Sequence, residues 1–182
     1  MGHRRLSIID LNDNAFQPME NFDKRYSITF NGEIYNYIEL REELLGKGCR
    51  FITDHSDTEV LLNAYGTWGV GCLERLRGMF AFAILDRQER TVFIARDRIG
   101  KKPLYYEISP DRFAFSSELT PLLRHAHAPR TVHPEALSFY LVFGYIPHPL
   151  SIVQEIKKLP PASYALVDLS RMRISIDRYW DI

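Results

Sequence analysis

Apolar and polar positions in the first third of the chain repeat with two different periods. Residues 26–30 (YSITF) alternate as a strand does, with successive side chains on opposite faces of a sheet. Residues 37–48 (YIELREELLGKG) instead place apolar side chains three and four positions apart and finish with two glycines. Residues 5–10 (RLSIID) are mostly apolar and β-branched, which is typical of a buried strand. The pattern therefore predicts a buried strand and a loop, then a second strand, a tight turn and a helix.

Two further helices are predicted from their start and stop signals. Residues 56–59 (SDTE) match a capping box, in which the serine caps the first turn and the glutamate reaches back to the serine backbone. Residues 60–69 continue this helix, and residues 70–78 offer another short amphipathic helix that Gly78 closes. We expect these helices to cover one face of a sheet.

Four short β-rich runs form the middle of the sequence. Charged or Pro/Asp turns separate them, and this spacing is typical of an antiparallel meander. The runs are residues 79–86 (MFAFAILD), 91–97 (TVFIARD), 103–109 (PLYYEIS) and 112–118 (RFAFSSE). We expect them to form the core of the sheet, with their aromatic side chains packed inside instead of forming a platform for nucleic-acid bases.

Helical and turn-rich segments alternate in the last third. Residues 119–125 and 134–143 are predicted helices, and two Pro-rich passages follow at residues 144–152 and 158–167. Residues 173–182 (RISIDRYWDI) predict one more strand. Runs of strands beside runs of helices, without a strict β-α-β alternation, indicate an α+β layered domain.

Composition limits the class of protein. The 182 residues, 46% of them hydrophobic, suit one domain over residues 1–182. Lys and Arg together number 23, as do Asp and Glu, and no apolar run approaches the roughly 20 residues that span a bilayer. We therefore expect a soluble, cytoplasmic protein that binds neither nucleic acid nor membrane. Cys49 and Cys72 form no CxxC pair, so we expect reduced, packed thiols. The histidines lack a metal-ligand spacing, and no metal site is expected.

Asn31-Gly32 has two interpretations. Asn-Gly between two β-rich runs is ordinarily a two-residue hairpin turn, and the local sequence favours that structure. The helix expected from Tyr37 leaves only about five residues for the second strand, at the short end of strand lengths. A strand that ends in Asn-Gly-Glu can instead present a side-chain amide and a backbone N–H to a ligand, which is chemically an oxyanion hole.

Arg5, Glu33 and Asp57 are further candidates. Arg5 alone could be a surface charge, and Asp57 alone could favour the positive end of its helix. Taken together, an arginine and two acids suit a free α-amino acid, because arginine grips a carboxylate and the acids take the ammonium group.

Residues 96–103 (RDRIGKKP) form a charge-dense segment after a strand. Five ionisable groups at first suggest contact with phosphate or nucleic acid. A hairpin turn with solvated charges is the interpretation that we favour.

The order of the motifs adds information that no single motif carries. The motifs occur in one order along almost the whole chain: RLSIIDL, QPM, FNGEIYNY, LREEL, FITDHSDTEVLL, YGTWG, LRGMFAFAILD, ARDRIGKKPLYY, FAFSSE and YW. In this order they resemble the glutamine-hydrolysing domain of asparagine synthetases, a class II glutamine amidotransferase domain. The resemblance implies an N-terminal-nucleophile hydrolase fold, a four-layer αββα sandwich that is incomplete at the N-terminus here.

The resemblance also implies roles for residues. In this family an N-terminal cysteine attacks the glutamine carboxamide with its own α-amine as base, and ammonia is released before the thioester is hydrolysed to glutamate. Matching motif to motif, Asn31 and Gly32 would form the oxyanion hole, and Glu33 and Asp57 would position the amide and amino ends of glutamine. Arg5 would bind its carboxylate, and backbone groups of Ile8 and Ile9 would line the site.

The sequence departs from the family pattern at both ends. The family's Met-Cys-Gly opening would lie upstream of Gly2, where this sequence has Met1, and neither Cys49 nor Cys72 has an N-terminal amine beside it. We therefore expect the nucleophile to be absent and the chain to be inactive alone. The synthetase domain, with its pyrophosphate loop, is likewise expected to be missing. No cofactor is expected in residues 1–182, whereas ATP and Mg²⁺ are implied for the synthetase domain.

The expected partners are glutamine, the synthetase domain and a second copy of the chain in a homodimer. Two other functions remain open from the sequence. One is a non-catalytic module that binds glutamine or pairs subunits, and the other is an amidotransferase of polysaccharide or amino-sugar synthesis.

Overall fold

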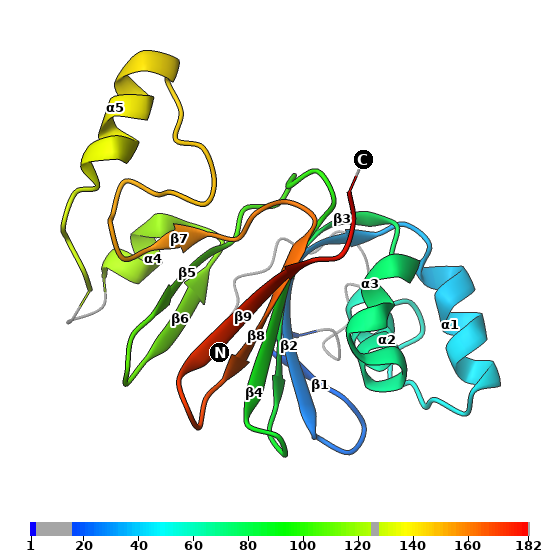
Figure 1. The fold of residues 1–182 in the computed structure, drawn as a ribbon. Helices are drawn as coiled ribbons and strands as arrows, with labels where there is room; N and C mark the ends of the chain where they lie inside the picture. Colours follow the sequence, from blue (N-terminus) through cyan, green and yellow to red (C-terminus); the bar gives the residue numbers. More distant parts are fainter. Residues whose placement is uncertain (3–15, 125–127, 182) are drawn as a thin grey trace.

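The computed structural model describes residues 1–2, 16–124 and 128–181, and its strands form two antiparallel sheets (Figure 1). The larger sheet has six strands in the order β1-β2-β3-β4-β8-β9, and the smaller has three in the order β6-β5-β7. The strands are β1 (Met19–Glu20), β2 (Tyr26–Ile34), β3 (Gly78–Asp86), β4 (Thr91–Arg96), β5 (Tyr105–Ile108), β6 (Phe113–Ser116), β7 (Lys157–Lys158), β8 (Ser163–Asp168) and β9 (Arg173–Arg178). The helices are α1 (Tyr37–Gly46), α2 (Asp57–Trp68), η2 (Gly69–Gly71), α3 (Cys72–Arg75), α4 (Leu119–Leu123) and α5 (Pro134–Phe143).

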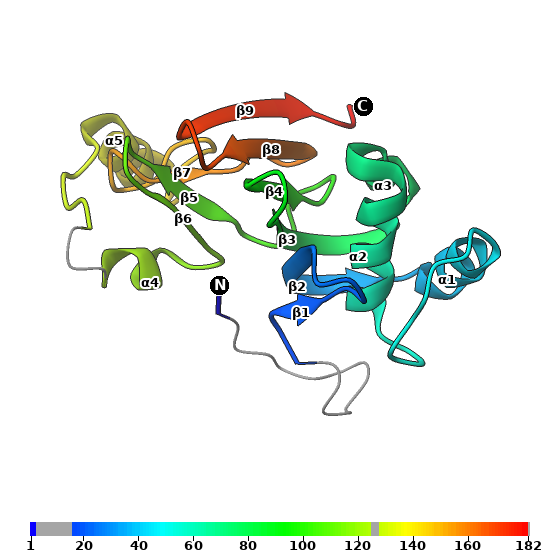
Figure 2. The same ribbon diagram turned by 90° about the horizontal axis from the view of Figure 1, so that it is seen from below.

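Alternation along β3 separates two hydrophobic cores. Phe80, Phe82 and Ile84 point to one face of the large sheet and pack with buried side chains of α1 and α2. Ala81 and Ala83 point to the other face and pack with side chains of the small sheet. The six-stranded sheet therefore lies between the helices α1–α3 and the small sheet (Figure 2).

A fourth layer covers the small sheet. Leu122 of α4 is buried in a third cluster together with Val153 and Ile156, and Tyr105 of β5 and Ala114 of β6 pack against it. The order helix, sheet, sheet, helix is the α+β layered arrangement that the sequence predicts.

The predicted meander is wrong, although its four strands exist. β3 pairs with β4 in the large sheet, whereas β5 pairs with β6 in the small sheet. Residues 97–104 thus lead from one sheet to the other. The physical reason is that β4 pairs on its far side with β8, which lies within a passage expected to be Pro-rich turns.

Gly78 begins β3 and does not close a helix, which corrects a second expectation. The preceding helix α3 ends at Arg75. A Cβ atom on Gly78 would lie 2.1 Å from the carbonyl oxygen of Glu33. Gly78 therefore permits the close approach of β2 and β3.

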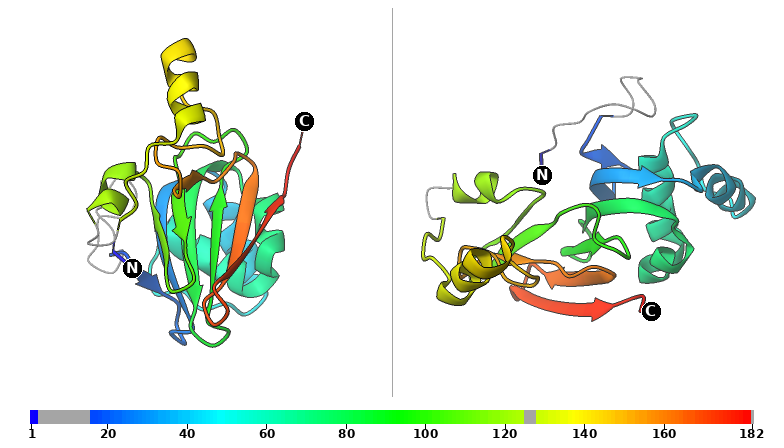
Figure 3. Two further views of the ribbon diagram at one scale, coloured as in Figure 1. Left: turned by 60° about the vertical axis from the view of Figure 1, so that its left-hand side comes forward. Right: turned by 90° about the horizontal axis from the view of Figure 1, so that it is seen from above.

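Helix α5 projects away from both sheets (Figures 1 and 3). Pro134 occupies its first turn, His133 caps its N-terminus by accepting from the Ala136 N–H, and Gly144 ends it in a left-handed conformation. Ala136 is its one buried residue. Its large apolar side chains are largely exposed to solvent, and Leu141 is 75% exposed.

Candidate functional site

Asn31 and Gly32 lie inside the nine-residue strand β2, so the hairpin interpretation is wrong. Asn31 pairs with Ala81 and Gly32 with Phe80 of β3. The strand continues past them to Ile34, which is buried as are Ile28 and Phe30 before them. A Cβ atom on Gly32 would lie 2.1 Å from the carbonyl oxygen of Met79. Glycine is therefore required here for the approach of two backbones, whatever else this position does.

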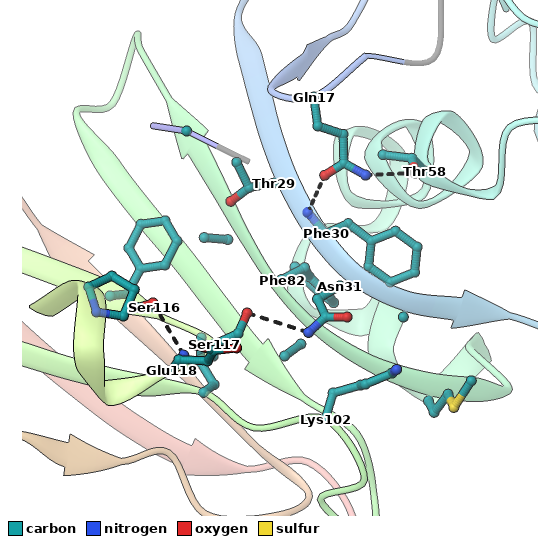
Figure 4. Close-up of a pocket in the computed structure, with 18 of the residues that line it drawn as sticks. Gln17, Thr29, Phe30, Asn31, Thr58, Phe82, Lys102, Ser116, Ser117 and Glu118 are labelled. Atoms are coloured by element: carbon teal, nitrogen blue, oxygen red, sulfur yellow. Dashed lines mark hydrogen bonds between the residues drawn. The ribbon is translucent and has the colours of Figure 1, made fainter. Parts of the chain in front are cut away.

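The end of β2 and the start of α2 form one wall of a cavity of about 920 Å³ (Figure 4). Four residues singled out in the sequence line it: Asn31, Gly32, Glu33 and Asp57. The opposite wall comes from the small sheet and its connections, and includes Lys102, Ser116, Ser117 and Glu118. Arg5, Ile8 and Ile9, the other predicted glutamine contacts, lie outside the described residues, as does the predicted strand over residues 5–10.

Asp57 connects helix α2 to the end of strand β2. Asp57 is 4% exposed, and its Oδ2 accepts from the backbone N–H of Ile34 at 3.1 Å. Asp57 also occupies the first turn of α2, where the helix dipole favours a negative charge. The side chain thus has a structural role in addition to its place in the cavity wall.

The predicted capping box forms in part. Ser56 Oγ accepts from the Glu59 N–H at 3.3 Å and caps α2 as expected. The Glu59 carboxylate accepts from the backbone N–H groups of Ile52 and Thr53, at 2.6 and 2.8 Å. Glu59 therefore fixes the loop before α2, and this fixes the helix start that carries Asp57.

Gln17 is a wall residue that the site prediction missed. Its Oε1 accepts from the Phe30 N–H at 2.6 Å, and its Nε2 donates to Thr58 Oγ1 at 3.4 Å (Figure 4). Gln17 thus ties β2 to α2 beside the cavity. A single Gln-Pro pair carries no local signal for this role, and only its place in the ordered motifs could have indicated it.

Ser117 is a second missed residue, on the opposite wall. Its Oγ accepts from Asn31 Nδ2 at 3.4 Å (Figure 4). The adjacent Ser116 Oγ accepts from the Glu118 N–H at 3.2 Å and shapes the turn before α4. The Asn31–Ser117 hydrogen bond therefore spans the space between the two sheets.

The charged segment after β4 is not a hairpin, and two of its five charged side chains, those of Arg96 and Asp97, are bonded to backbone groups, whereas Lys101 is exposed. Asp97 is 1% exposed and accepts from the backbone N–H groups of Phe80, Lys101 and Lys102. The Arg96 guanidinium donates to the carbonyl oxygens of Lys102, Leu159 and Gly100, and burial lowers its pKa. These charges hold the crossover between the sheets, because buried backbone groups of an irregular segment need partners. The segment places Lys102 at the cavity.

The two cysteines are free thiols, as predicted. Cys72 is fully buried, and burial raises its pKa to about 12. Cys49 is half-buried, with its Sγ 3.3 Å from Thr67 Oγ1. Neither is among the described residues that line the cavity.

Neither a metal site nor a membrane-spanning helix is found in the part of the chain that the structure describes. Residues 1–2, 16–124 and 128–181 contain no group of three or more His, Cys, Asp or Glu side chains placed to hold a metal ion. Within the same ranges, none of the helices has the length and apolar character needed to cross a membrane.

Comparisons with known proteins identify the family and agree with the fold. The sequence profile of the glutamine amidotransferase domain matches residues 1–180. The chain is 47% identical over 162 residues to asparagine synthetase [glutamine-hydrolyzing] 1 of Bacillus subtilis (strain 168), covering 89% of this chain and 25% of that protein. It is 39% identical over 184 residues to asparagine synthetase [glutamine-hydrolyzing] 3 of the same organism, covering 100% of this chain and 29% of that protein. The chain thus spans between a quarter and a third of the length of these relatives.

Solved structures share the fold at low sequence identity. The glutamine phosphoribosylpyrophosphate amidotransferase of B. subtilis, complexed with ADP and GMP, superposes with a TM-score of 0.60 at 19% identity, over 93% of this chain and 33% of that one. A glutamine aminotransferase class-II domain protein from Silicibacter pomeroyi gives a TM-score of 0.52 at 17% identity, over 86% of this chain and 68% of that one. With the profile match over almost the whole chain, these likenesses lead to one conclusion: the chain belongs to the class II glutamine amidotransferase domain family.

Proposed function

We propose that the wall formed by Asn31, Gly32, Glu33 and Asp57 binds glutamine, and that the domain supplies ammonia from glutamine to an asparagine synthetase. The observation that carries this proposal is that all four residues, taken from the end of β2 and the first turn of α2, line one cavity. The names of the relatives support the choice of glutamine as substrate and asparagine as product.

Each side chain has a chemical task in this proposal. The Asn31 amide and the Gly32 backbone N–H stabilise the negative charge that develops on the carboxamide oxygen when a thiolate adds to it. Glu33 accepts from the amide nitrogen of glutamine, and Asp57 faces the α-ammonium group. Arg5, with backbone groups of Ile8 and Ile9, completes the proposed pocket by holding the α-carboxylate.

The reaction proposed for the whole enzyme has two halves. A cysteine thiolate forms a bond to the carboxamide carbon, and the α-amine passes the thiol proton to the amide nitrogen, so that the C–N bond breaks and ammonia leaves. Water then cleaves the thioester to give glutamate. The ammonia is used in an ATP-dependent amidation of aspartate. The second half belongs to a synthetase domain, since the matched stretch is only 25% to 29% of the relatives' length.

Calorimetric titration of the 182-residue protein with glutamine tests the proposal. We expect glutamine to bind to the wild-type protein. Glu33→Gln should raise the Kd by about tenfold or more, because hydrogen bonds to charged groups contribute about 1.5–3 kcal/mol. Glutamate should bind more weakly than glutamine, because its carboxylate would face Glu33.

Glu39→Gln is the matched control for this titration. Glu39 lies on the exposed surface of α1, so its replacement removes the same charge away from the cavity. We expect its Kd to equal that of the wild type. No heat of binding from the wild-type protein, or equal losses in both variants, would contradict the proposed pocket.

A further inference from the structure

The Asn31 carboxamide reaches across the cavity from one sheet to the other. Asn31 belongs to β2 in the large sheet, and Ser117 lies between β6 of the small sheet and helix α4. Asn31 Nδ2 donates to Ser117 Oγ at 3.4 Å (Figure 4). Both residues line the cavity and are partly exposed to it. The contact therefore lies where a ligand would meet the Asn31 amide.

The Asn31 carboxamide can donate a further hydrogen bond to such a ligand. A carboxamide nitrogen carries two N–H donors. Ser117 takes one of them, so the second is left for an oxygen atom in the cavity. The terminal torsion of an asparagine side chain is broad when nothing holds it. A hydrogen bond to a fixed partner narrows this torsion and holds the plane of the amide.

Ser117 is a fixed partner because its own segment is anchored on both sides. Before it, β6 pairs with β5, and the Ser116 hydroxyl accepts from the Glu118 N–H. After it, Leu122 of α4 is 6% exposed in the cluster beneath. The Asn31 backbone is fixed as well, because it pairs with Ala81. Asn31 thus lies in a paired strand, and Ser117 directly follows one.

We propose that Ser117 is a positioning residue that holds the Asn31 carboxamide in the orientation required to bind the oxygen of the glutamine side chain. This role rests on the proposed function, because it gives the second Asn31 N–H a partner only when glutamine occupies the cavity. Preorganised donors are the main source of stabilisation at such an oxygen, so loss of the Ser117 hydroxyl weakens binding without removing the donor itself.

Proton–nitrogen correlation spectra of the 182-residue protein test the positioning directly. The Asn31 side-chain resonances are identified by their loss in Asn31→Asp. We expect Ser117→Ala to shift these resonances and to speed the hydrogen exchange of the bonded proton. Ser117→Thr, which keeps the hydroxyl, should restore the wild-type shift. Ser138→Ala is the matched control, since the Ser138 hydroxyl donates to the Pro134 carbonyl oxygen on exposed α5.

Glutamine titration of the same variants provides the functional measurement. We expect the Kd of Ser117→Ala to rise by about two- to tenfold, the range of one ordinary hydrogen bond. Ser117→Thr and Ser138→Ala should bind as the wild type does. Thermal unfolding of Ser117→Ala should remain close to that of the wild type, because the side chain is partly exposed.

The outcomes separate the two proposals. If the wild-type protein does not bind glutamine, the proposed function fails, whatever the amide spectra show. If it binds glutamine, but Ser117→Ala leaves both the Kd and the Asn31 resonances unchanged, the positioning role is overturned. A shifted resonance with an unchanged Kd also overturns the role in binding.

Discussion

Two residues of the cavity wall have structural tasks that would explain them without any chemistry. Gly32 is required where β2 approaches β3, because a Cβ atom would lie 2.1 Å from Met79 O and 2.8 Å from Phe80 Cα. Asp57 holds the Ile34 N–H and suits the first turn of α2. Neither residue type is by itself evidence for glutamine binding. Their value for the proposed function comes from lining one cavity together with Asn31 and Glu33.

The steric role of Gly32 predicts the effect of a single methyl group. Gly32→Ala should lower the Tm by about 5 °C or more, because the strands must separate or shift to admit the Cβ atom. Gly46→Ala in helix α1 is the matched control, since a Cβ atom there meets nothing within 4 Å. The control should leave stability unchanged or raise it by about 0.5–1 kcal/mol, because alanine is the better helix former.

Circular dichroism melts of the two variants measure this difference. A Gly32→Ala protein as stable as the wild type would mean that β2 and β3 leave room for a Cβ atom at this position. It would also leave chemistry as the remaining reason for glycine at this position.

The two helices of the small-sheet side differ in how their apolar side chains are used. On α4, Leu122 is buried against the small sheet. On α5, six large apolar side chains on and just after the helix are at least 40% exposed: Leu137, Tyr140, Leu141, Val142, Phe143 and Tyr145. Helix α5 therefore owes its geometry to its caps and to the buried Ala136 at its base, and not to an apolar face packed on the domain.

This contrast between the helices predicts opposite results from the same substitution. Leu122→Ala should lower the free energy of unfolding by about 2–5 kcal/mol, since it empties a buried site. Leu141→Ala should change it by no more than about 0.5 kcal/mol, because the side chain already contacts water. Urea unfolding of both variants gives the two values. A loss at Leu141 similar to that at Leu122 would show that another surface covers α5 in solution.

At the scale of the whole molecule, the sequence predicts where helices and strands lie better than it predicts which strands pair with one another. Residues 134–143 form the helix expected from their pattern, and residues 26–30 lie in a strand. Local periodicity does not say which strands pair, so it missed the division of four strands between two sheets. It also missed β8, whose alternating burial lies next to two prolines. Pairing partners are set by contacts distant in sequence, which no local pattern contains.

The residues of the candidate site also differ in how far the sequence could predict them. Physical reasoning on single residues left Asn31-Gly32 as a hairpin and Asp57 as an ordinary helix-start residue. Their grouping came from the order of the motifs, and the cavity supports the grouping because it brings four of the residues to one wall. Gln17 and Ser117 were missed because their contacts join segments 41 and 86 residues apart. A single sequence offers no signal for such pairs.

Strand β3 of the large sheet contributes side chains to both hydrophobic cores, so we expect the two sheets to unfold together. Ala83 is fully buried between the sheets, whereas its neighbours Phe82 and Ile84 pack under the helices.

Ala83→Leu should overpack the core between the sheets and lower the free energy of unfolding by about 1–3 kcal/mol. Because β3 contributes to both cores, the loss should reach the helical layer. With the second tryptophan replaced by Trp180→Phe, the fluorescence of Trp68, at the end of α2, should therefore shift its urea midpoint by the same amount as the circular dichroism signal. Leu141→Ala serves as the control that moves neither midpoint. If Ala83→Leu moves the circular dichroism midpoint and leaves that of Trp68 in place, the helical layer unfolds separately, and the wall that carries Asn31 and Asp57 is then stable without the wall that carries Ser117.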